Sequence, residues 1–402
     1  MKNVTLFFAL ICLSFCLLPT YGKSRIASVP FKVVGSYMIV EVRINGSTKM
    51  NMILDSGASA TLITELTEED SLSLNYNSLI EIKGLGTGSG VMANRSQFNE
   101  LRAGKIKLTN QTVYVLKENI FNLSNHVGYK INGILGADFF QNHIVRINYN
   151  TQVITLYDSK TFEVPKGYEP ISMSIERNRM YITLPVTGSN WKVHQATLLL
   201  DTGAEVTAWF RSFGENHIEI PKKNIDRYIG QGLNGVIEGH LGRINQISMK
   251  GHILNAPVVA FPDSLSIAEV ISISERDGII GGQLLNRFNL IFDYPKRTLW
   301  IKPNSNFKKP FTYNIAGLDL SIENKFLALP EVCNVSKNSP AERADIRVGD
   351  QIFKINELNA LQTTINDIRL QFMSISKKPI KLILLRGNAT IYTEVEMSDQ
   401  LK

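Results

Sequence analysis

Cysteine is scarce in this chain of 402 residues, which contains only three. Cys12 and Cys16 lie in an apolar run near the N-terminus, from Val4 to Leu18, and only Cys333 lies elsewhere. A single remaining cysteine excludes an intrachain disulfide, so stability must come from burial. Because Cys333 has apolar neighbours in the sequence, we expect it to be buried. The run of 15 residues is also too short to span a bilayer comfortably, and no other run reaches that length.

Clustered charge and the common metal and nucleotide motifs are lacking as well. The 43 Lys and Arg residues against 36 Asp and Glu give a net charge of +7, and the excess is dispersed, unlike a nucleic-acid or membrane patch. Neither a Gly-x-Ser-x-Gly elbow nor a phosphate loop is present, and Ser89 stands where a dinucleotide motif would need its third glycine. No His-Glu-x-x-His spacing occurs among the six histidines, which are His126, His143, His194, His217, His240 and His252. We therefore expect no metal, no cofactor and no nucleic-acid partner.

The first 22 residues have the pattern of a secretory signal peptide. Lys2 supplies the positive charge, and the apolar run follows it. A lipid anchor on Cys16 is not expected, because the bulky Phe15 precedes it where a small residue would be needed. We expect an exported protein, located in the periplasm or cell envelope or secreted, with no integral membrane segment after cleavage.

An internal repeat organises the chain. The block Ile53–Thr61, which contains Asp-Ser-Gly, recurs as Leu199–Thr207, which contains Asp-Thr-Gly, with Asp55 and Asp201 146 residues apart. A second block, ending in Ile134-Leu135-Gly136, recurs as Ile279-Ile280-Gly281, and its two glycines are 145 residues apart. Two separate blocks agree on the offset to within one residue, so the chain contains two homologous lobes.

Short strands separated by Gly, Asn and Asp turns predict that both lobes are mainly β. Few stretches are long enough for amphipathic helices. A third segment that matches neither lobe follows the second. The expected boundaries are a signal peptide at 1–22, a first lobe at 23–157, a linker at 158–170, a second lobe at 171–303, a linker at 304–310 and a C-terminal domain at 311–402.

The two aspartates form a candidate catalytic pair. Each follows an apolar strand and precedes a hydroxyl residue and a glycine, as a carboxylate held at a sharp turn requires. Taken singly, either tripeptide is an ordinary turn, but its recurrence at corresponding positions of duplicated lobes favours a pair. Two carboxyls brought within a few ångströms share a proton, which leaves one base and one acid at the same pH.

These blocks resemble the signature of the aspartic peptidases over about 270 residues. The resemblance implies two closed β-barrel lobes related by a pseudo-twofold axis, with an extended substrate between them beneath a flap. Its implied catalytic residues are Asp55 and Asp201. The implied supports of the pair are Ser56, Gly57, Thr202, Gly203, Gly136 and Gly281. Both lobes have Gly-rich flap candidates, as a fused tandem of retroviral-type peptidase lobes would have; the flap residues are Gly84, Gly86, Gly88, Gly230 and Gly232.

The C-terminal domain resembles a PDZ domain of the bacterial, protease-associated kind. The resemblance rests on Ser339-Pro340-Ala341, Ala344–Arg347 and the Gly-Asp turn at Gly349. It implies an α+β fold in which the loop Ala316–Leu320 receives a peptide carboxylate and a helix near 363–375 flanks the groove. The expected peptide-binding residues are Gly317, Leu318, Asp319 and Leu320.

Three functions are compatible with these patterns. The favoured one is an exported aspartic endopeptidase whose PDZ domain recruits substrate or regulates cleavage, with peptides or proteins as partners. A second is a non-catalytic peptide-binding envelope protein that uses the PDZ domain. A third, hydrolysis of glycosidic bonds by the same carboxylates, is not supported by the duplicated turns. Since both aspartates and both hydroxyl residues are present, the sequence favours the peptidase.

Overall fold

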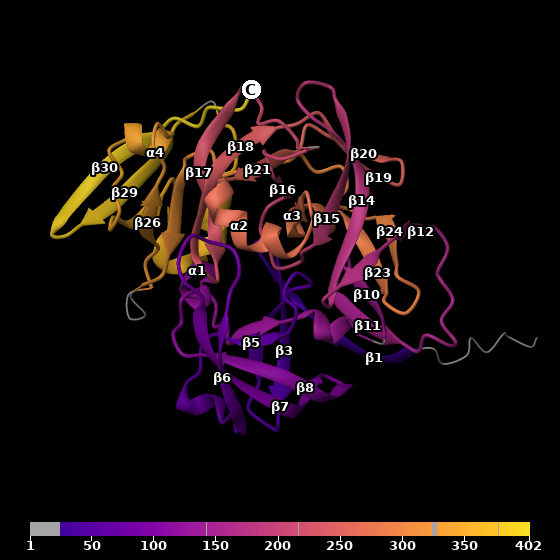
Figure 1. Ribbon diagram of the computed structural model, residues 1–402. Coiled ribbons are helices and arrows are strands. Elements are labelled where there is room, and N and C mark those ends of the chain that lie inside the picture. Colours follow the sequence, from indigo (N-terminus) through magenta and orange to yellow (C-terminus); the bar gives the residue numbers. More distant parts are fainter. Residues whose placement is uncertain (1–24, 142, 216, 324–327, 377) are drawn as a thin grey trace, which may run out of the picture.

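The computed structural model describes residues 25–141, 143–215, 217–323, 328–376 and 378–402. The expected signal peptide lies outside them. The fold is mainly β, with 46% strand and 11% helix, as the turn pattern predicts. Figure 1 shows the first lobe in indigo and purple at the bottom, the second lobe in magenta to orange above it, and the C-terminal domain in orange to yellow at the left.

The first lobe is a closed barrel. Strand pairing runs in the order β3-β4-β9-β5-β8-β7, and a further pairing of β7 with β3 closes the ring. Apolar side chains alternate inward along these strands and form the core. The elements of this lobe are β1 (Arg25–Pro30), β2 (Lys32–Val34), β3 (Tyr37–Ile44), β4 (Met50–Leu54), β5 (Thr61–Ile63), η1 (Glu68–Asp70), β6 (Tyr76–Ile82), β7 (Val91–Ala103), β8 (Ile106–Leu116), α1 (Leu123–Val127), β9 (Gly133–Leu135), η2 (Ala137–Phe140), β10 (Ile144–Asn148) and β11 (Val153–Tyr157).

The second lobe repeats this arrangement with interrupted strands. Its sheet runs β18-β21-β16-β22-β15-β14, and β19, which follows β18 along the chain, pairs with β14. The elements are β12 (Glu169–Ser172), β13 (Ser174–Glu176), β14 (Arg179–Thr187), β15 (Val193–Leu200), β16 (Ala208–Phe210), β17 (Asn224–Gly232), β18 (Gly235–Arg243), β19 (Gln246–Met249), β20 (His252–Asn255), β21 (Val258–Pro262), α2 (Ser264–Ile273), β22 (Gly278–Ile280), α3 (Gly282–Leu285), β23 (Phe288–Asp293) and β24 (Thr298–Pro303).

A third sheet joins the two lobes. Its six strands run β1-β11-β10-β23-β24-β12, so that β10 of the first lobe pairs antiparallel with β23 of the second. Above this sheet the cores of both lobes form one apolar cluster. Phe140 and Phe292 contact each other across the boundary, with ring centroids 4.9 Å apart. The lobes are therefore continuous at their base.

The C-terminal domain has its own core, built on a sheet of order β25-β26-β27-β29-β30. Helix α5 lies inside the 363–375 region where a helix was expected. Ser339 caps α4, because its Oγ accepts the Glu342 N–H at 3.1 Å. The elements are β25 (Leu318–Ser321), β26 (Glu331–Val335), α4 (Pro340–Arg343), β27 (Gln351–Ile355), β28 (Leu358–Asn359), η3 (Ala360–Gln362), α5 (Ile365–Gln371), β29 (Ile380–Arg386) and β30 (Ala389–Val395).

One expectation about burial is wrong. Cys333 is exposed, although its sequence neighbours are apolar. The reason is strand alternation: Val332 points into the core of the C-terminal domain, so the next residue of β26 points to the other face. In the described part of the chain, no helix has the length and apolarity needed to cross a membrane.

Candidate active site

Two equivalent strand ends hold the aspartates. Asp55 directly follows β4 and Asp201 directly follows β15. In each lobe, the strand that ends in the second repeat block runs parallel beside the aspartate's strand, β9 beside β4 and β22 beside β15. The carbonyls of Leu135 and Ile280 accept the N–H groups of Asp55 and Asp201, each at 2.9 Å. The repeat therefore fixes both aspartates by the same backbone contacts.

The lobes bring the two carboxyls together. A Cβ atom on Gly57 would lie 2.6 Å from Cγ of Asp201, and one on Gly203 would lie 2.3 Å from Cγ of Asp55. Each carboxyl is thus packed on the glycine of the opposite lobe, and the two carboxyls are close enough to shift each other's pKa. Only glycine allows this approach, because any side chain would displace a carboxyl.

The hydroxyl residues join the loops across the pseudo-twofold axis. Ser56 Oγ donates to the Leu200 carbonyl at 2.7 Å and accepts the Thr202 N–H at 3.1 Å. Reciprocally, Thr202 Oγ1 donates to the Leu54 carbonyl at 2.8 Å and accepts the Ser56 N–H at 3.0 Å. Both side chains are buried, so these four bonds hold the carboxyls in register.

The glycines of the second repeat block support the loops from behind. A Cβ on Gly136 would lie 2.4 Å from the backbone of Ala60, and one on Gly281 would lie 2.2 Å from the Val206 carbonyl. Ala60 and Val206 belong to the loops that follow the two aspartates. The structure thus places both glycines where their strands approach the loops of the two aspartates closely.

The electrostatics of the pair are asymmetric. Burial raises the pKa of both carboxyls, and the Asp55 charge raises that of Asp201 further. The carboxyl of Asp55 accepts the N–H groups of Gly57 at 2.7 Å and Ala58 at 3.1 Å, whereas Asp201 accepts only that of Gly203, at 3.0 Å. These contacts favour the anion at Asp55, whereas the pKa of Asp201 is raised well above its usual value.

Two arginines near the pair were not predicted. The Arg179 charge lowers the pKa of Asp55, and the Arg276 charge lowers that of Asp201, in both cases against the larger effect of burial. Arg276 is only 4% exposed, and its guanidinium lies 5.3 Å from the ring centroid of Trp209. The repeat could have drawn attention to Arg276, because the equivalent position of the first lobe holds the apolar Ile131. A charged residue in only one of two homologous lobes indicates a role specific to that lobe.

The two flap candidates contact each other. The loop between β6 and β7 carries Gly84, Gly86 and Gly88, and the turn of the β17–β18 hairpin follows Gly232. Asn234, in that turn, donates its N–H to the Leu85 carbonyl at 2.7 Å and accepts the Gly88 N–H at 2.5 Å. Its side-chain Oδ1 accepts the Gly84 N–H at 3.0 Å. The sequence offered no reason to select Asn234.

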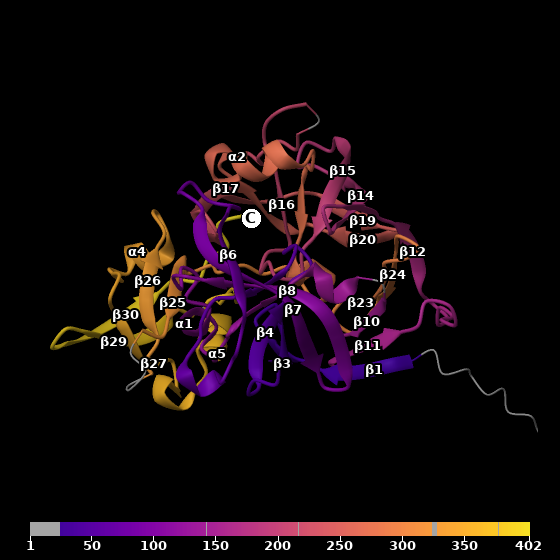
Figure 2. The same cartoon turned by 60° about the horizontal axis from the view of Figure 1, so that its bottom comes forward.

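The tip of each flap also packs against the opposite lobe. Leu85 of the first flap packs against an apolar cluster of the second lobe around Trp209, and Leu233 packs against a first-lobe cluster around Leu62. In Figure 2 the loop beyond β6 reaches toward β17. By contrast Gly230 has open space on its side-chain side, since nothing lies within 4 Å of a Cβ built there.

The expected peptide-binding loop of the C-terminal domain is closed. The Gly317 N–H is already bonded to Asn314 Oδ1 at 3.0 Å, and Arg227 of the second lobe covers the loop. The side chains of Leu318 and Leu320 are each 1% exposed, while Asp319 accepts the Asn334 side-chain amide at 2.8 Å. The structure therefore buries this loop instead of presenting it to solvent.

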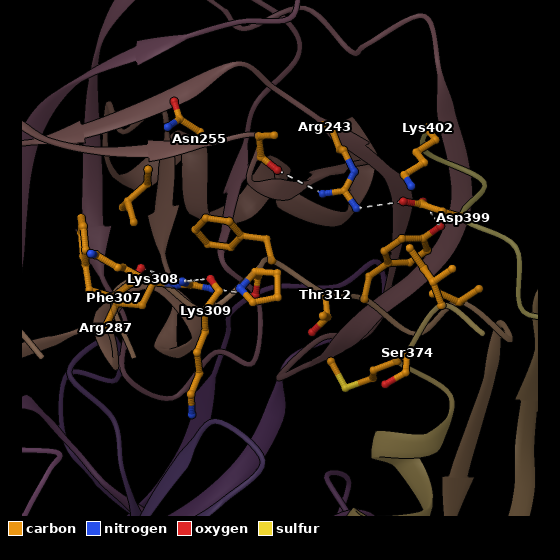
Figure 3. A pocket seen from close by; sticks show the side chains of 18 of the residues that line it. Arg243, Asn255, Arg287, Phe307, Lys308, Lys309, Thr312, Ser374, Asp399 and Lys402 are labelled. Atoms are coloured by element: carbon orange, nitrogen blue, oxygen red, sulfur yellow. Dashed lines mark hydrogen bonds and ion pairs between the residues drawn. The ribbon is translucent and has the colours of Figure 1, made fainter. Parts of the chain in front are cut away.

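A separate cavity of about 900 Å³ lies where the second lobe, the linker and the C-terminal domain meet. Figure 3 shows its basic rim, with Arg243 paired to Asp399 at 3.2 Å. None of its lining residues belongs to the aspartate pair or to the flaps. In the described residues, no group of three or more His, Cys, Asp or Glu side chains could hold a metal ion.

Two protein-family profiles match parts of this chain. The aspartyl protease family profile matches the chain twice, at residues 40–139 and 185–284. A PDZ domain profile matches residues 331–370. No curated protein matches the chain. Among solved structures, an aspartic proteinase from Irpex lacteus is similar at 12% identity with a TM-score of 0.43, covering 70% of this chain and 98% of that one.

Fold, paired aspartates and family matches together define an aspartic-type peptidase. Specifically, the chain contains two aspartyl protease domains in tandem followed by a C-terminal PDZ domain.

Proposed function

We propose that this peptidase is an exported endopeptidase that cleaves peptide bonds through a water activated by Asp55 and Asp201. The observation that carries the proposal is the reciprocal packing of each carboxyl on the glycine of the opposite lobe. Two carboxyls this close share one proton, and the four cross-lobe hydrogen bonds fix their positions.

In the proposed mechanism the two aspartates have different starting roles. Asp55, stabilised by two backbone N–H groups, takes a proton from the water as that water attacks the peptide carbonyl. Asp201 donates its proton to the carbonyl oxygen, which gives a neutral gem-diol. As the C–N bond of this intermediate breaks, the proton held by Asp55 passes to the leaving amine and a gem-diol hydroxyl returns a proton to Asp201. The buried pair needs no charge from outside, because one negative charge is present before and after each transfer.

The flaps and the PDZ domain supply substrate binding. Glycine-rich backbone at the flap tips can hydrogen-bond an extended peptide, and the contacts through Asn234 must open to admit it. A PDZ domain binds peptide segments by adding a strand to a sheet edge, which suits recruitment of substrate or control of cleavage. Peptides or proteins are thus the proposed partners of both parts.

The decisive experiment is cleavage of a mixed peptide library by residues 23–402, between about pH 3 and 8. We expect activity that a statine-type inhibitor blocks and that Asp201→Asn abolishes. The matched control is Asp226→Asn, which removes an exposed carboxylate of the same lobe, 73% exposed in its side chain. Wild-type silence across this range, with peptides still bound by the PDZ domain, would instead support a binding protein.

Export rests on the sequence of residues 1–22. The proposed destination is the periplasm or cell envelope, or the medium. Expression of the full chain in a bacterial host, followed by fractionation and N-terminal analysis of the product, tests this. We expect the mature chain to begin at Lys23 outside the cytoplasm, and an uncleaved cytoplasmic chain would refute export.

A further inference from the structure

The outer edge of strand β25 is already occupied. This strand is the last of the PDZ sheet, where a bound peptide would add a strand. The Leu318 carbonyl accepts the Asn314 side-chain amide at 2.5 Å, and the Leu320 carbonyl accepts the Arg369 guanidinium at 2.5 Å. Just beyond the strand, the Ile322 N–H donates to a backbone carbonyl of the first lobe, that of Asn125, at 3.0 Å.

The first-lobe segment Leu123–Gly128 contacts the C-terminal domain at β25 and α5, which pack against each other. Besides its backbone contact with Ile322, Asn125 donates its side-chain amide to Glu323 at 3.1 Å. At the other end of the segment, a Cβ on Gly128 would lie 2.3 Å from Cγ2 of Ile365, the first residue of α5. Helix α1, which begins this segment, lies beside β25 in Figure 2. The segment thus contacts both elements that would flank a bound peptide in a PDZ domain.

The part of the domain that would receive a chain end is not available. As described above, Asn314 bonds the Gly317 N–H. Arg227 is 7% exposed, and its Nη2 lies 3.0 Å from where a Cβ of Gly317 would be. The groove therefore holds an internal segment while its carboxylate loop is covered. An internal ligand needs only the strand edge and the helix wall.

We propose that the PDZ groove binds internal peptide segments, that its resident ligand is the first-lobe segment Leu123–Gly128, and that an incoming peptide competes with this segment. The inference rests on the proposed peptide binding by the PDZ domain and adds the kind of ligand and its competitor. It requires no free C-terminal carboxylate in the incoming peptide.

Such competition acts on the peptidase lobes. The PDZ domain is fixed to the second lobe, because Val258 is part of its core and Arg243 pairs with Asp399. Its contacts with the first lobe include the bonds of Asn125 to Ile322 and Glu323 and the close approach of Gly128 to Ile365. The resident segment leads through Ile131 to β9, which supports the loop of Asp55. Displacement of the segment therefore removes a contact between the first lobe and a domain that stays attached to the second.

The test uses the full mature chain with Asp201→Asn, so that no probe is cleaved. Binding of a fluorescent peptide spanning Phe121 to Lys130 is measured by anisotropy, with a free or an amidated C-terminus. Gly128→Ala introduces a Cβ that clashes with Ile365 and expels the resident segment. Gly46→Ala is the matched control, because Gly46 is also a left-handed glycine of the first lobe, with φ of 79° against 69°, but has open space around it.

We expect Gly128→Ala to bind the peptide about tenfold more tightly than the parent or more, because the groove no longer has to be emptied first. Gly46→Ala should match the parent, and amidation should change nothing. The Ile322 amide should exchange hydrogen faster only in Gly128→Ala. Equal affinities in all three chains, absence of binding in all three, or a need for the free carboxylate would each overturn the proposal. Catalysis is not measured, so a failure here leaves the proposed peptidase function standing.

Discussion

The Leu85 carbonyl accepts the N–H of Asn234 at 2.7 Å, so that the flap of each lobe holds the flap of the other. Leu85 and Leu233 complete the link, because each packs against the opposite lobe. Entry of a peptide must break this contact, so substitutions at the flap tips should change how readily a peptide enters.

Substitutions at Gly232 and Gly230, both in β17, test whether the contact between the flaps limits substrate entry. We expect Gly232→Ala to disrupt the contact, because its Cβ would lie 2.2 Å from the Leu85 carbonyl. Gly230→Ala adds the same methyl where nothing lies within 4 Å. Gly232→Ala should change KM for peptides several-fold, while Gly230→Ala stays near wild type. Identical kinetics for both variants would show that the closed contact does not limit substrate entry.

Arg276 should set the alkaline side of the pH profile. Its charge lowers the pKa of Asp201, so Arg276→Met should raise that pKa. Asp201 must be protonated to act as the acid, so the fall in kcat/KM at high pH should move to higher pH. Arg276→Lys keeps the charge and should keep the limb near its wild-type position. A limb that moves equally in both variants would assign the effect to lost packing on Trp209 instead.

The cross-lobe hydroxyls should contribute to stability as a unit. Ser56→Ala leaves the buried Thr202 N–H without its acceptor, which costs about 1–3 kcal/mol. Thr202→Val should have a similar effect, and the double variant should cost less than the two costs added, because the bonds belong to one network. Thr202→Ser retains the hydroxyl and is the control. Urea midpoints measure the series, and strict additivity would contradict a shared network.

Asp138 should make stability depend on pH. Burial raises its pKa to about 6, although Thr61 donates to it through N–H and Oγ1 at 3.2–3.3 Å. Since the folded chain holds this proton more tightly, its contribution is present below about pH 4 and is lost as pH rises to about 6, by at most about 3 kcal/mol.

Asp138→Asn is the corresponding test. The second lobe suggests that the change is tolerated, because neutral Gln283 accepts the equivalent Thr207 hydroxyl at 3.1 Å. We expect the variant to lose less stability than wild type between pH 4 and 7 in thermal unfolding. If the two proteins respond to pH in parallel, Asp138 is not the group responsible.

The aspartate pair could be predicted because the duplicated blocks specify the same local geometry in both lobes. Asp55, Asp201 and the two block glycines each occupy positions defined by short-range rules of strand and turn, and the offset matched them. The placement of Asn234 and the flap leucines depends on contacts between lobes, which no local pattern encodes.

The covering of the PDZ loop could not be predicted from the sequence of its own domain. Residues 316–320 have the expected position within their domain, but Arg227 comes from another domain and covers them. The prediction that Cys333 is buried was wrong for a simpler reason. Adjacent residues of a strand point to opposite faces, so a buried neighbour does not imply burial.

The pairing of β10 with β23 has the symmetry of a contact between two identical subunits. Val145 faces Phe292 and Ile147 faces Leu290, while the repeat makes Val145 equivalent to Leu290 and Ile147 equivalent to Phe292. This is an isologous interface contained in one polypeptide. Two separate lobes would assemble their dyad only at sufficient concentration, whereas the covalent link keeps it assembled at any dilution. Each half is thereby free to diverge, because Asp138 has Gln283 and the buried Arg276 has Ile131 at the equivalent position of the other lobe.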